Sequence, residues 1–247
     1  MTKKLDGKVA LITGATRGIG AGVALALARE GAHIIMVGRT TGALEDMDDA
    51  IREIGSETTL VPMNLSDHDA IDRLGGHVAE KWGKLDILIG NAGALGAITP
   101  LGHIKPKDWD MLMAVNVTAN YRLIRSFDAL LRAADAARAI FVTSSVAESC
   151  RPYWGGYAIT KAALNCMVKT YANEIANSTG IKANIINPGP IRTSMRAAAM
   201  PGEDPDTLDT PHDIAPLFVK MCLPEFKANG EIISYAEYKA GAYGNMF

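Results

Sequence analysis

Six short runs of aliphatic and β-branched residues recur along the chain, each followed by a longer amphipathic stretch, and a seventh run lies further on. The runs cover residues 8–13, 33–38, 58–63, 85–90, 138–143, 181–187 and 231–235. They are apolar throughout rather than alternating, which is typical of strands that are covered on both faces. The sequence therefore predicts a parallel sheet buried between two layers.

The amphipathic stretches between these runs predict helices. They cover residues 18–30, 42–54, 67–82, 107–133, 157–177 and 211–222. Gly31 follows the first stretch as a C′ glycine would, and Pro211 follows Thr210 as an N1 proline follows an N-cap. The alternation predicts one α/β domain over residues 1–247. We expect a Rossmann-type, doubly wound domain, with a parallel seven-stranded sheet flanked by helices on both faces.

One long segment, residues 193–210, shows no regular pattern. Irregular loops of this length are uncommon in compact domains and often cover a functional site. We therefore expect this segment to form a lid over a substrate.

Composition excludes several classes of partner. The 247 residues carry a formal net charge of -2, which gives no electrostatic reason to bind nucleic acid or an anionic membrane. The three cysteines are too few for a disulfide framework, and no Cys or His spacing predicts a metal site. No apolar run approaches the roughly 20 residues that span a bilayer. We expect a cytoplasmic protein that acts on a small molecule.

Residues 13–20, TGATRGIG, connect the first predicted strand to the first predicted helix. Gly14, Gly18 and Gly20 permit a tight turn and a close approach of the backbone to a ligand. The helix behind them offers free N–H groups and the positive end of its dipole to a phosphate. In this position the motif predicts a dinucleotide-binding loop, and a plain tight turn is the alternative.

Two arginines indicate which dinucleotide would bind. In Rossmann domains that bind NAD, an acidic residue about 20 positions after the loop holds the ribose 2′-hydroxyl. Here Gly38 and Arg39 stand at that point, and Arg17 lies inside the glycine loop. Guanidinium groups suit a 2′-phosphate, so NADP(H) is favoured over NAD(H). The alternative is that either arginine is merely solvated.

Tyr157 and Lys161, four positions apart, share one face of a predicted helix. A free tyrosine has a pKa near ~10, and a cation within about 4–6 Å can lower it by roughly 1–3 pH units. The pair therefore predicts a phenol that exchanges its proton closer to working pH, as general acid–base catalysis requires. Taken alone, the pair could also be incidental on a solvated helix.

Taken together, these motifs resemble those of the short-chain dehydrogenase/reductase family. The resemblance covers essentially the whole chain. It rests on TGATRGIG (13–20), GNAG (90–93), AVNV (114–117), VTSS (142–145), YAITK (157–161) and NPGPIRT (187–193), in the family's order. The chain resembles in particular a bacterial branch without a settled substrate. The resemblance implies an NADP(H)-dependent oxidoreductase that transfers hydride between the nicotinamide and a carbonyl or secondary alcohol.

The resemblance also implies roles for individual residues. Tyr157 would be the catalytic acid/base, Lys161 its activator and a ribose ligand, and Asn116 part of a proton relay. The cofactor would contact Gly14, Thr16, Arg17, Gly18, Ile19, Gly20, Arg39, Asn64, Leu65, Asn91, Ala92, Gly93, Tyr157, Lys161, Pro188, Gly189, Ile191 and Thr193. Asn64 stands where the family usually has an aspartate, and its amide can still accept a hydrogen bond.

A substrate-orienting serine is implied at the end of the fifth predicted strand, where the chain offers two. Ser144 has the family's separation from Tyr157, about 13 residues, whereas local alignment of FVTSSVA favours Ser145. We favour Ser145 as the catalytic serine and keep Ser144 as the alternative.

Two wider expectations complete the sequence prediction. The resemblance implies a homo-oligomer, a tetramer or a dimer, with the helices at 107–133 and 157–177 forming a four-helix interface. The alternative function is a catalytically silent nucleotide-binding sensor or scaffold. That alternative predicts broken catalytic residues, and none is broken in this sequence.

Overall fold

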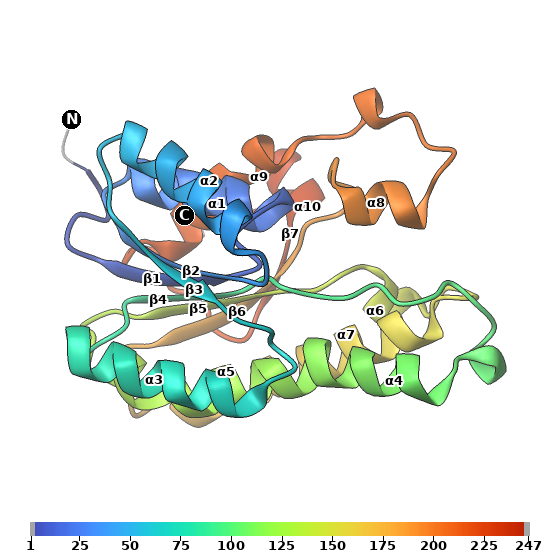
Figure 1. Ribbon diagram of the computed structural model, residues 1–247, viewed down its shortest axis with the longest axis horizontal. Helices are drawn as coiled ribbons and strands as arrows, with labels where there is room; N and C mark the ends of the chain where they lie inside the picture. The colour runs from blue at the N-terminus through green and yellow to red at the C-terminus, as the bar shows by residue number, and fades with distance from the viewer. Residues whose placement is uncertain (1–2, 245–247) are drawn as a thin grey trace.

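The computed structural model describes residues 3–244, whose strands form a single seven-stranded parallel sheet (Figure 1). The strands are β1 (Val9–Thr13), β2 (His33–Gly38), β3 (Thr58–Pro62), β4 (Ile87–Gly90), β5 (Arg138–Val142), β6 (Lys182–Asn187) and β7 (Ile232–Ser234). Their order is β3-β2-β1-β4-β5-β6-β7, so the winding reverses between β1 and β4. The predicted doubly wound α/β fold is confirmed. Residues 1–2 and 245–247 of the predicted domain lie outside the described residues.

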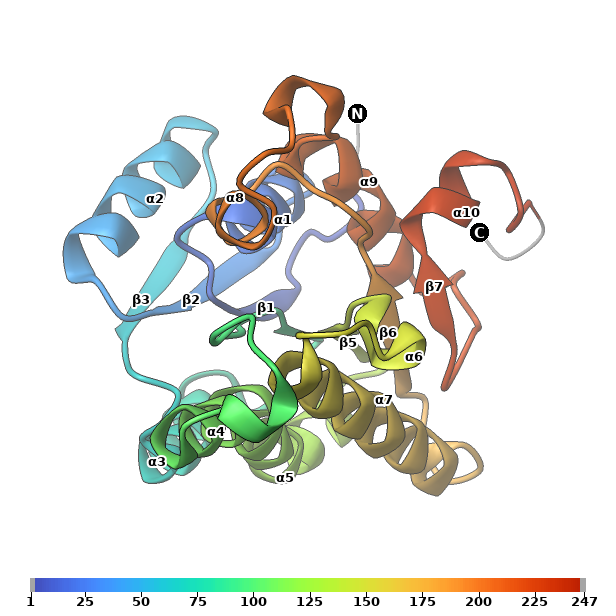
Figure 2. The ribbon, with the colours of Figure 1, turned by 90° about the vertical axis from the view of Figure 1, so that its right-hand side faces the viewer.

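Helices cover both faces of the sheet, as the end view shows (Figure 2). One face carries α1 (Gly18–Arg29), α2 (Thr41–Glu53) and α9 (Pro211–Cys222), and the other carries α3 (His68–Trp82), α5 (Ala119–Arg132) and α7 (Gly155–Ile175). Successive strand residues enter opposite cores: Leu11 packs with the α3, α5 and α7 layer, and Ile12 with the α1 and α9 layer. This double burial explains why the central strands are apolar on both faces over most of their length.

Shorter helices lie beyond the carboxyl ends of the strands. They are α4 (Pro106–Met113), α6 (Val146–Ser149) and α8 (Ser194–Ala199), while α10 (Tyr235–Lys239) follows β7 directly (Figure 1). The helix predicted over 107–133 exists as a continuous helical stretch, but it is not α-helical throughout. Helix α4 passes through a π-helical segment, Ala114–Thr118, before α5 begins. Such π turns occur mostly as single turns and often at functional sites.

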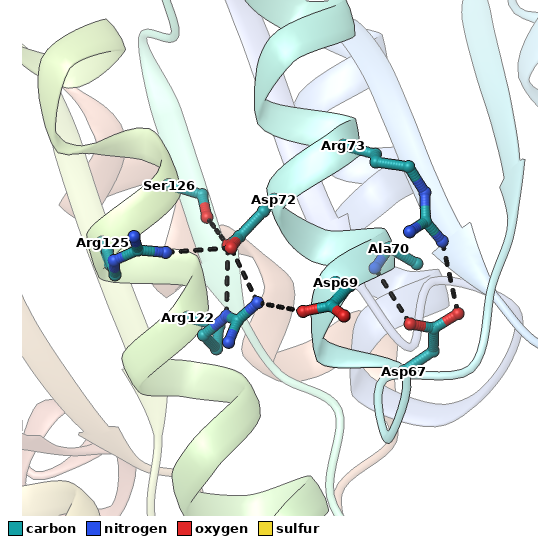
Figure 3. A network of polar contacts seen from close by, with 8 residues as sticks. All are labelled: Asp67, Asp69, Ala70, Asp72, Arg73, Arg122, Arg125 and Ser126. Carbon is teal, nitrogen blue, oxygen red and sulfur yellow. Dashed lines mark hydrogen bonds and ion pairs between the residues drawn. The ribbon is translucent and has the colours of Figure 1, made fainter.

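Helices α3 and α5 are joined by charged side chains (Figure 3). Asp72 of α3 accepts hydrogen bonds from Arg122 at 2.7 Å and Arg125 at 2.9 Å, both on α5. Exposed ion pairs of this kind add little stability because water screens them. Close backbone packing contributes more: a Cβ at Gly75 of α3 would lie 2.9 Å from the carbonyl oxygen of Ser126. Gly75 therefore sets how closely the two helices approach.

Substituting Gly75→Ala should lower the free energy of unfolding by about 1–2 kcal/mol, because the added methyl group forces α3 away from α5. A Cβ at the neighbouring Gly76 would meet no atom within 4 Å, so this residue provides a matched control in the same helix. Gly76→Ala should raise stability by roughly 0.5–1 kcal/mol through helix propensity alone. Urea unfolding of both variants measures the contrast, and equal stabilities would contradict the packing argument.

Candidate active site

The glycine loop connects β1 to α1 at the carboxyl edge of the sheet. Gly14 and Gly18 have positive φ angles of 66° and 57°, and a Cβ at Gly20 would lie 2.2 Å from the carbonyl oxygen of Gly14. The first turn of α1 contains no acidic residue, and its N-cap, Arg17, makes no side-chain capping bond. The N–H groups that begin a helix need partners, so this N-terminus is suited to receive a phosphate.

The loop after β4 fastens the glycine loop. The buried hydroxyl of Thr13 accepts hydrogen bonds from the backbone N–H groups of Asn91 and Ala92, both at 3.0 Å. The Asn91 amide donates to the carbonyl oxygens of Thr13 at 2.9 Å and Gly14 at 3.3 Å. Asn91 and Ala92 therefore hold the shape of the predicted cofactor-binding loop through its own backbone.

The two arginines predicted to hold a 2′-phosphate are both exposed. The residues before them are in contact, because a Cβ at Gly38, which precedes Arg39, would lie 2.8 Å from the methyl group of Thr16, which precedes Arg17. Within the described residues neither Arg17 nor Arg39 is recorded in an ion pair, so both guanidinium groups remain available to an anionic ligand.

Two further loops flank the glycine loop. After β6, Ile191 is buried and the Thr193 methyl group would lie 3.2 Å from a Cβ at Gly18, which places Thr193 against the glycine loop. After β3, the Asn64 side chain is exposed and accepts a hydrogen bond from Ser66 at 3.1 Å. The remaining residues predicted to bind the cofactor lie nearby in the same elements. Ile19 is in the first turn of α1, Leu65 follows β3, Gly93 follows β4, and Pro188 and Gly189 follow β6.

Tyr157 and Lys161 lie in the first half of α7. The Lys161 ammonium is almost completely buried and donates a hydrogen bond of 2.8 Å to the carbonyl oxygen of Val142, at the end of β5. Its Nζ lies 5.6 Å from the centre of the Tyr157 ring. The structure thus brings the predicted pair together beside the strand that leads to the serines.

Burial shifts the pKa of both groups. It raises the pKa of the Tyr157 phenol to about 12 and lowers the pKa of the Lys161 ammonium to about 8. The predicted lowering of the Tyr157 pKa is therefore wrong for this structure, because loss of hydration on burial disfavours the phenolate. At neutral pH Tyr157 is a neutral proton donor and most Lys161 side chains are charged.

Asn116 lies fully buried in the π-helical segment. Its amide oxygen accepts from the backbone N–H of Ala94 at 2.8 Å, and its amide nitrogen donates to the Ala94 carbonyl at 2.8 Å and to the Thr160 hydroxyl at 3.0 Å. Thr160 in turn donates to the carbonyl oxygen of Tyr157 at 2.8 Å. Asn116 thereby ties the loop after β4 to α7. Sequence reasoning missed Ala94 and Thr160, since nothing in their residue types signals these contacts.

Both candidate serines lie at the carboxyl end of β5. Ser144 is half-buried, while Ser145 is exposed and begins α6. Both line the same small cavity. Ser145 as the catalytic serine stays a prediction.

The segment predicted as an irregular lid, residues 193–210, is more ordered than expected. It contains α8 and a short 3-10 helix, Pro205–Thr207. Thr193 caps α8 by accepting a hydrogen bond from the N–H of Arg196 at 3.1 Å, and Arg196 pairs with Glu203 through bonds of 2.5 and 2.6 Å. These contacts depend on side-chain pairing across a turn, which periodicity does not reveal. Its action as a lid stays a prediction.

Residues 3–244 hold neither a metal centre nor a membrane-spanning helix. No three His, Cys, Asp or Glu side chains among them are grouped so that they could hold a metal ion. None of the helices described combines the length and apolar character needed to cross a membrane.

The fold and this arrangement of loops define a class of dinucleotide-binding oxidoreductases. Residues 8–204 match the family model described as short chain dehydrogenase. The chain belongs to the short-chain dehydrogenase/reductase family.

Relatives of known sequence or structure agree with this classification. The chain is 36% identical over 218 residues to the uncharacterized oxidoreductase YciK of Escherichia coli K12, covering 87% of this chain and 86% of the relative. A short-chain dehydrogenase structure from Pseudomonas syringae matches with a TM-score of 0.92 at 36% identity, over 95% of this chain and 96% of the other. One from Escherichia coli CFT073, complexed with NADPH, matches with a TM-score of 0.90 at 34% identity, over 95% and 98%.

Substituting Asn116→Ala should lower the free energy of unfolding by about 1–3 kcal/mol, because it leaves the N–H and carbonyl of the half-buried Ala94 without their partners and empties a fully buried position. The exposed Asn64 provides the control, and Asn64→Ala should change stability by less than about 0.5 kcal/mol. Urea unfolding compares the two. A similar, small change in both variants would show that the contacts of Asn116 do not hold the loop.

Proposed function

We propose that the protein is an NADP(H)-dependent oxidoreductase that transfers hydride between the nicotinamide and a carbonyl or secondary alcohol. The observation that carries the proposal is the buried pair of Tyr157 and Lys161, 5.6 Å from ring centre to ammonium nitrogen, at the sheet edge that also bears the glycine loop. A scaffold protein would have no reason to keep a buried ammonium below a phenol, since burying both groups costs stability.

The chain's residues fit a phosphorylated dinucleotide. The uncapped N-terminus of α1 would hold the pyrophosphate, and Arg17 and Arg39 would hold the 2′-phosphate. The relative that was crystallised with NADPH supports this choice of cofactor. When bound, the nicotinamide supplies or accepts the hydride.

Tyr157 would hold the transferred proton at its Oη. In reduction, the carbonyl oxygen gains negative charge as hydride arrives, and the neutral phenol donates its proton to that oxygen. A pKa of about 12 keeps the phenol protonated at neutral pH, which suits this direction. In oxidation, the phenolate would accept the alcohol proton, and a bound dinucleotide that displaces water from the site would strengthen each charge interaction.

The positive charge of Lys161 would stabilise the phenolate form of Tyr157. Its bond to the Val142 carbonyl fixes the ammonium below the ring, so a positive charge is already in place when Tyr157 releases its proton. This prior placement costs no reorganisation during the reaction. We also propose that Lys161 binds the cofactor ribose, since an ammonium carries three donors and, among residues 3–244, makes one hydrogen bond, to Val142.

Asn116 and a serine would complete the site. Both N–H groups of the Asn116 amide already bond to protein atoms, Ala94 and Thr160. We therefore propose that Asn116 serves the proton relay by positioning α7 and the loop after β4. Ser145, or else Ser144, would hold the substrate oxygen from the end of β5.

We also propose a homo-oligomer. Tyr121 on α5 and Ile159 on α7 are exposed large side chains on the two helices expected at an interface. Apolar groups of this size often mark contacts between subunits. Light scattering at micromolar concentration measures the mass, and a monomer would refute this part of the proposal.

Substituting Tyr157→Phe should reduce the turnover of carbonyl substrates by about 100-fold or more, because it removes the proton donor but keeps the ring. NADPH affinity should remain within about twofold of the starting protein, as measured by fluorescence titration. Turnover is followed by the absorbance of NADPH over a panel of ketones, aldehydes and alcohols. A cofactor that binds without any turnover across the panel would favour the silent sensor instead.

Substituting Arg39→Asp should lower the preference for NADPH over NADH by about 10- to 100-fold, since a carboxylate repels the 2′-phosphate and accepts a bond from a 2′-hydroxyl. Lys169→Asp, the same change in charge at an exposed site on α7, should leave the preference unaltered. Dissociation constants for both cofactors give the ratio. An unchanged ratio in the Arg39 variant would reject its assigned role.

A further inference from the structure

A small polar cavity of about 250 Å³ lies at the carboxyl ends of β5, β6 and β7, beside the serine pair. None of the cofactor-binding residues proposed above lines it, while Ser144 and Ser145 do. The cavity therefore adjoins the candidate active site without being part of the dinucleotide site.

A row of polar side chains forms the floor of this cavity. Asn187 of β6 pairs with Ser234 of β7, and Thr143 lies one residue beyond the pairing of Val142 with Ile186. The three polar residues thus stand side by side on neighbouring strands. Alternation along these strands points them towards the α7 layer, where apolar residues would otherwise be expected.

Two atoms that line the cavity lack partners. The Thr143 hydroxyl and the Asn165 amide oxygen of α7 are buried and have no hydrogen-bond partner within the described residues. Thr143 is 3% exposed and Asn165 9% exposed. Because an unpaired buried polar atom costs about 1–3 kcal/mol, such atoms are nearly always satisfied. Their position in one cavity indicates a ligand that supplies the missing hydrogen bonds.

The chemistry of the lining selects the kind of ligand. Glu148 and Glu237 both line the cavity, and no Lys, Arg or His among the described residues contributes to its wall. Glu237 also accepts a bond from the Tyr243 hydroxyl, so Glu148 is the carboxylate with more capacity to spare. The unpartnered amide oxygen of Asn165 accepts hydrogen bonds, so a complementary ligand group must donate one. Because two glutamates line the same cavity, that group should also carry a positive charge. The volume of about 250 Å³ corresponds to roughly eight waters at roughly 30 Å³ each, so the cavity admits only a small molecule or one end of a larger one.

We propose that this cavity binds a primary ammonium group carried by the substrate. Its ammonium would donate to Asn165 and to Glu148, while the carbonyl or alcohol carbon of the same molecule would lie across the serine pair, towards Tyr157. The class of substrate is then an amino ketone or amino alcohol. The binding of the ammonium rests on the cavity alone, whereas the identity of the substrate rests also on the proposed function.

Calorimetry on the full chain with ethanolammonium chloride tests the binding. We expect saturable binding, with no binding of 1-propanol, which lacks the charge. Glu148→Gln should weaken the affinity at least fivefold, and Glu45→Gln, an exposed carboxylate on α2, should not. Absence of binding would mean that ordered water alone fills the cavity and would overturn the proposal. Equal effects of potassium chloride would overturn it too, because they would indicate an alkali cation.

The variant Asn165→Leu tests whether the unpartnered oxygen of Asn165 contacts a ligand or is merely an unsatisfied group within the fold. Leucine has a similar size and no polar atoms, so the variant should fold and be at least as stable as the starting protein, because an unpaired buried oxygen is removed. Ethanolammonium binding should fall at least fivefold in this variant. Unchanged binding would show that Asn165 does not contact the ligand and would reject the site.

Oxidation of paired alcohols with NADP tests the substrate class. We expect kcat/KM for 1-amino-2-propanol to exceed that for 2-butanol at least tenfold, and the preference to disappear in Glu148→Gln. Binding of ethanolammonium without such a preference would refute the assignment to the substrate. Failure to oxidise any alcohol in a broad panel would instead reject the proposed function, and the calorimetric result would stand.

Discussion

Coverage of both faces of the parallel sheet by helices is the constraint on which the rest of the structure depends. A polar side chain within such a sheet needs a partner, as Asn184 of β6 has in the carbonyl oxygen of Ala228, since burial without a partner is costly. The chain therefore places its polar chemistry where the strands end. Thr13, Asn91, Thr143 and Asn187 all lie at or just after the carboxyl end of a strand. The glycine loop, the arginines and the serines collect at the same edge, as expected for sheets that wind in two directions.

The sequence predicted the helices and strands whose residue pattern is local. It did not predict features that are set by contacts between residues far apart in the chain. Every predicted strand exists within about two residues of its bounds, because buried strands are apolar throughout. The helical span predicted over 107–133 is present, but its pattern did not reveal the π-helical turn in which Asn116 bonds to Ala94, 22 residues away along the chain. Motif spacing brought Tyr157 and Lys161 together correctly. It could not predict their protonation, since burial depends on the whole fold.

The buried pair shows how function competes with stability. Hydration favours both charged forms, so enclosing Lys161 lowers its pKa to about 8 and enclosing Tyr157 raises its pKa to about 12. The carbonyl oxygen of Val142 compensates the buried ammonium in part. Active sites often retain such costly arrangements because a charge fixed in advance need not be rearranged during reaction. The packing of helices against both faces of the sheet offsets the free-energy cost of burying this pair.

The internal pairing of Arg196 with Glu203 has a consequence for how such proteins diversify. This pairing restricts the conformations of the segment locally and so offsets part of the entropy cost of ordering it, about 1–2 kcal/mol per residue. The two ends of residues 193–210 remain fixed to the scaffold, since Thr193 lies against Gly18 and Asp209 pairs with Lys239, so only the stretch between them is suited to exchange. Grafting the corresponding stretch between relatives could alter selectivity while the scaffold beneath remains untouched.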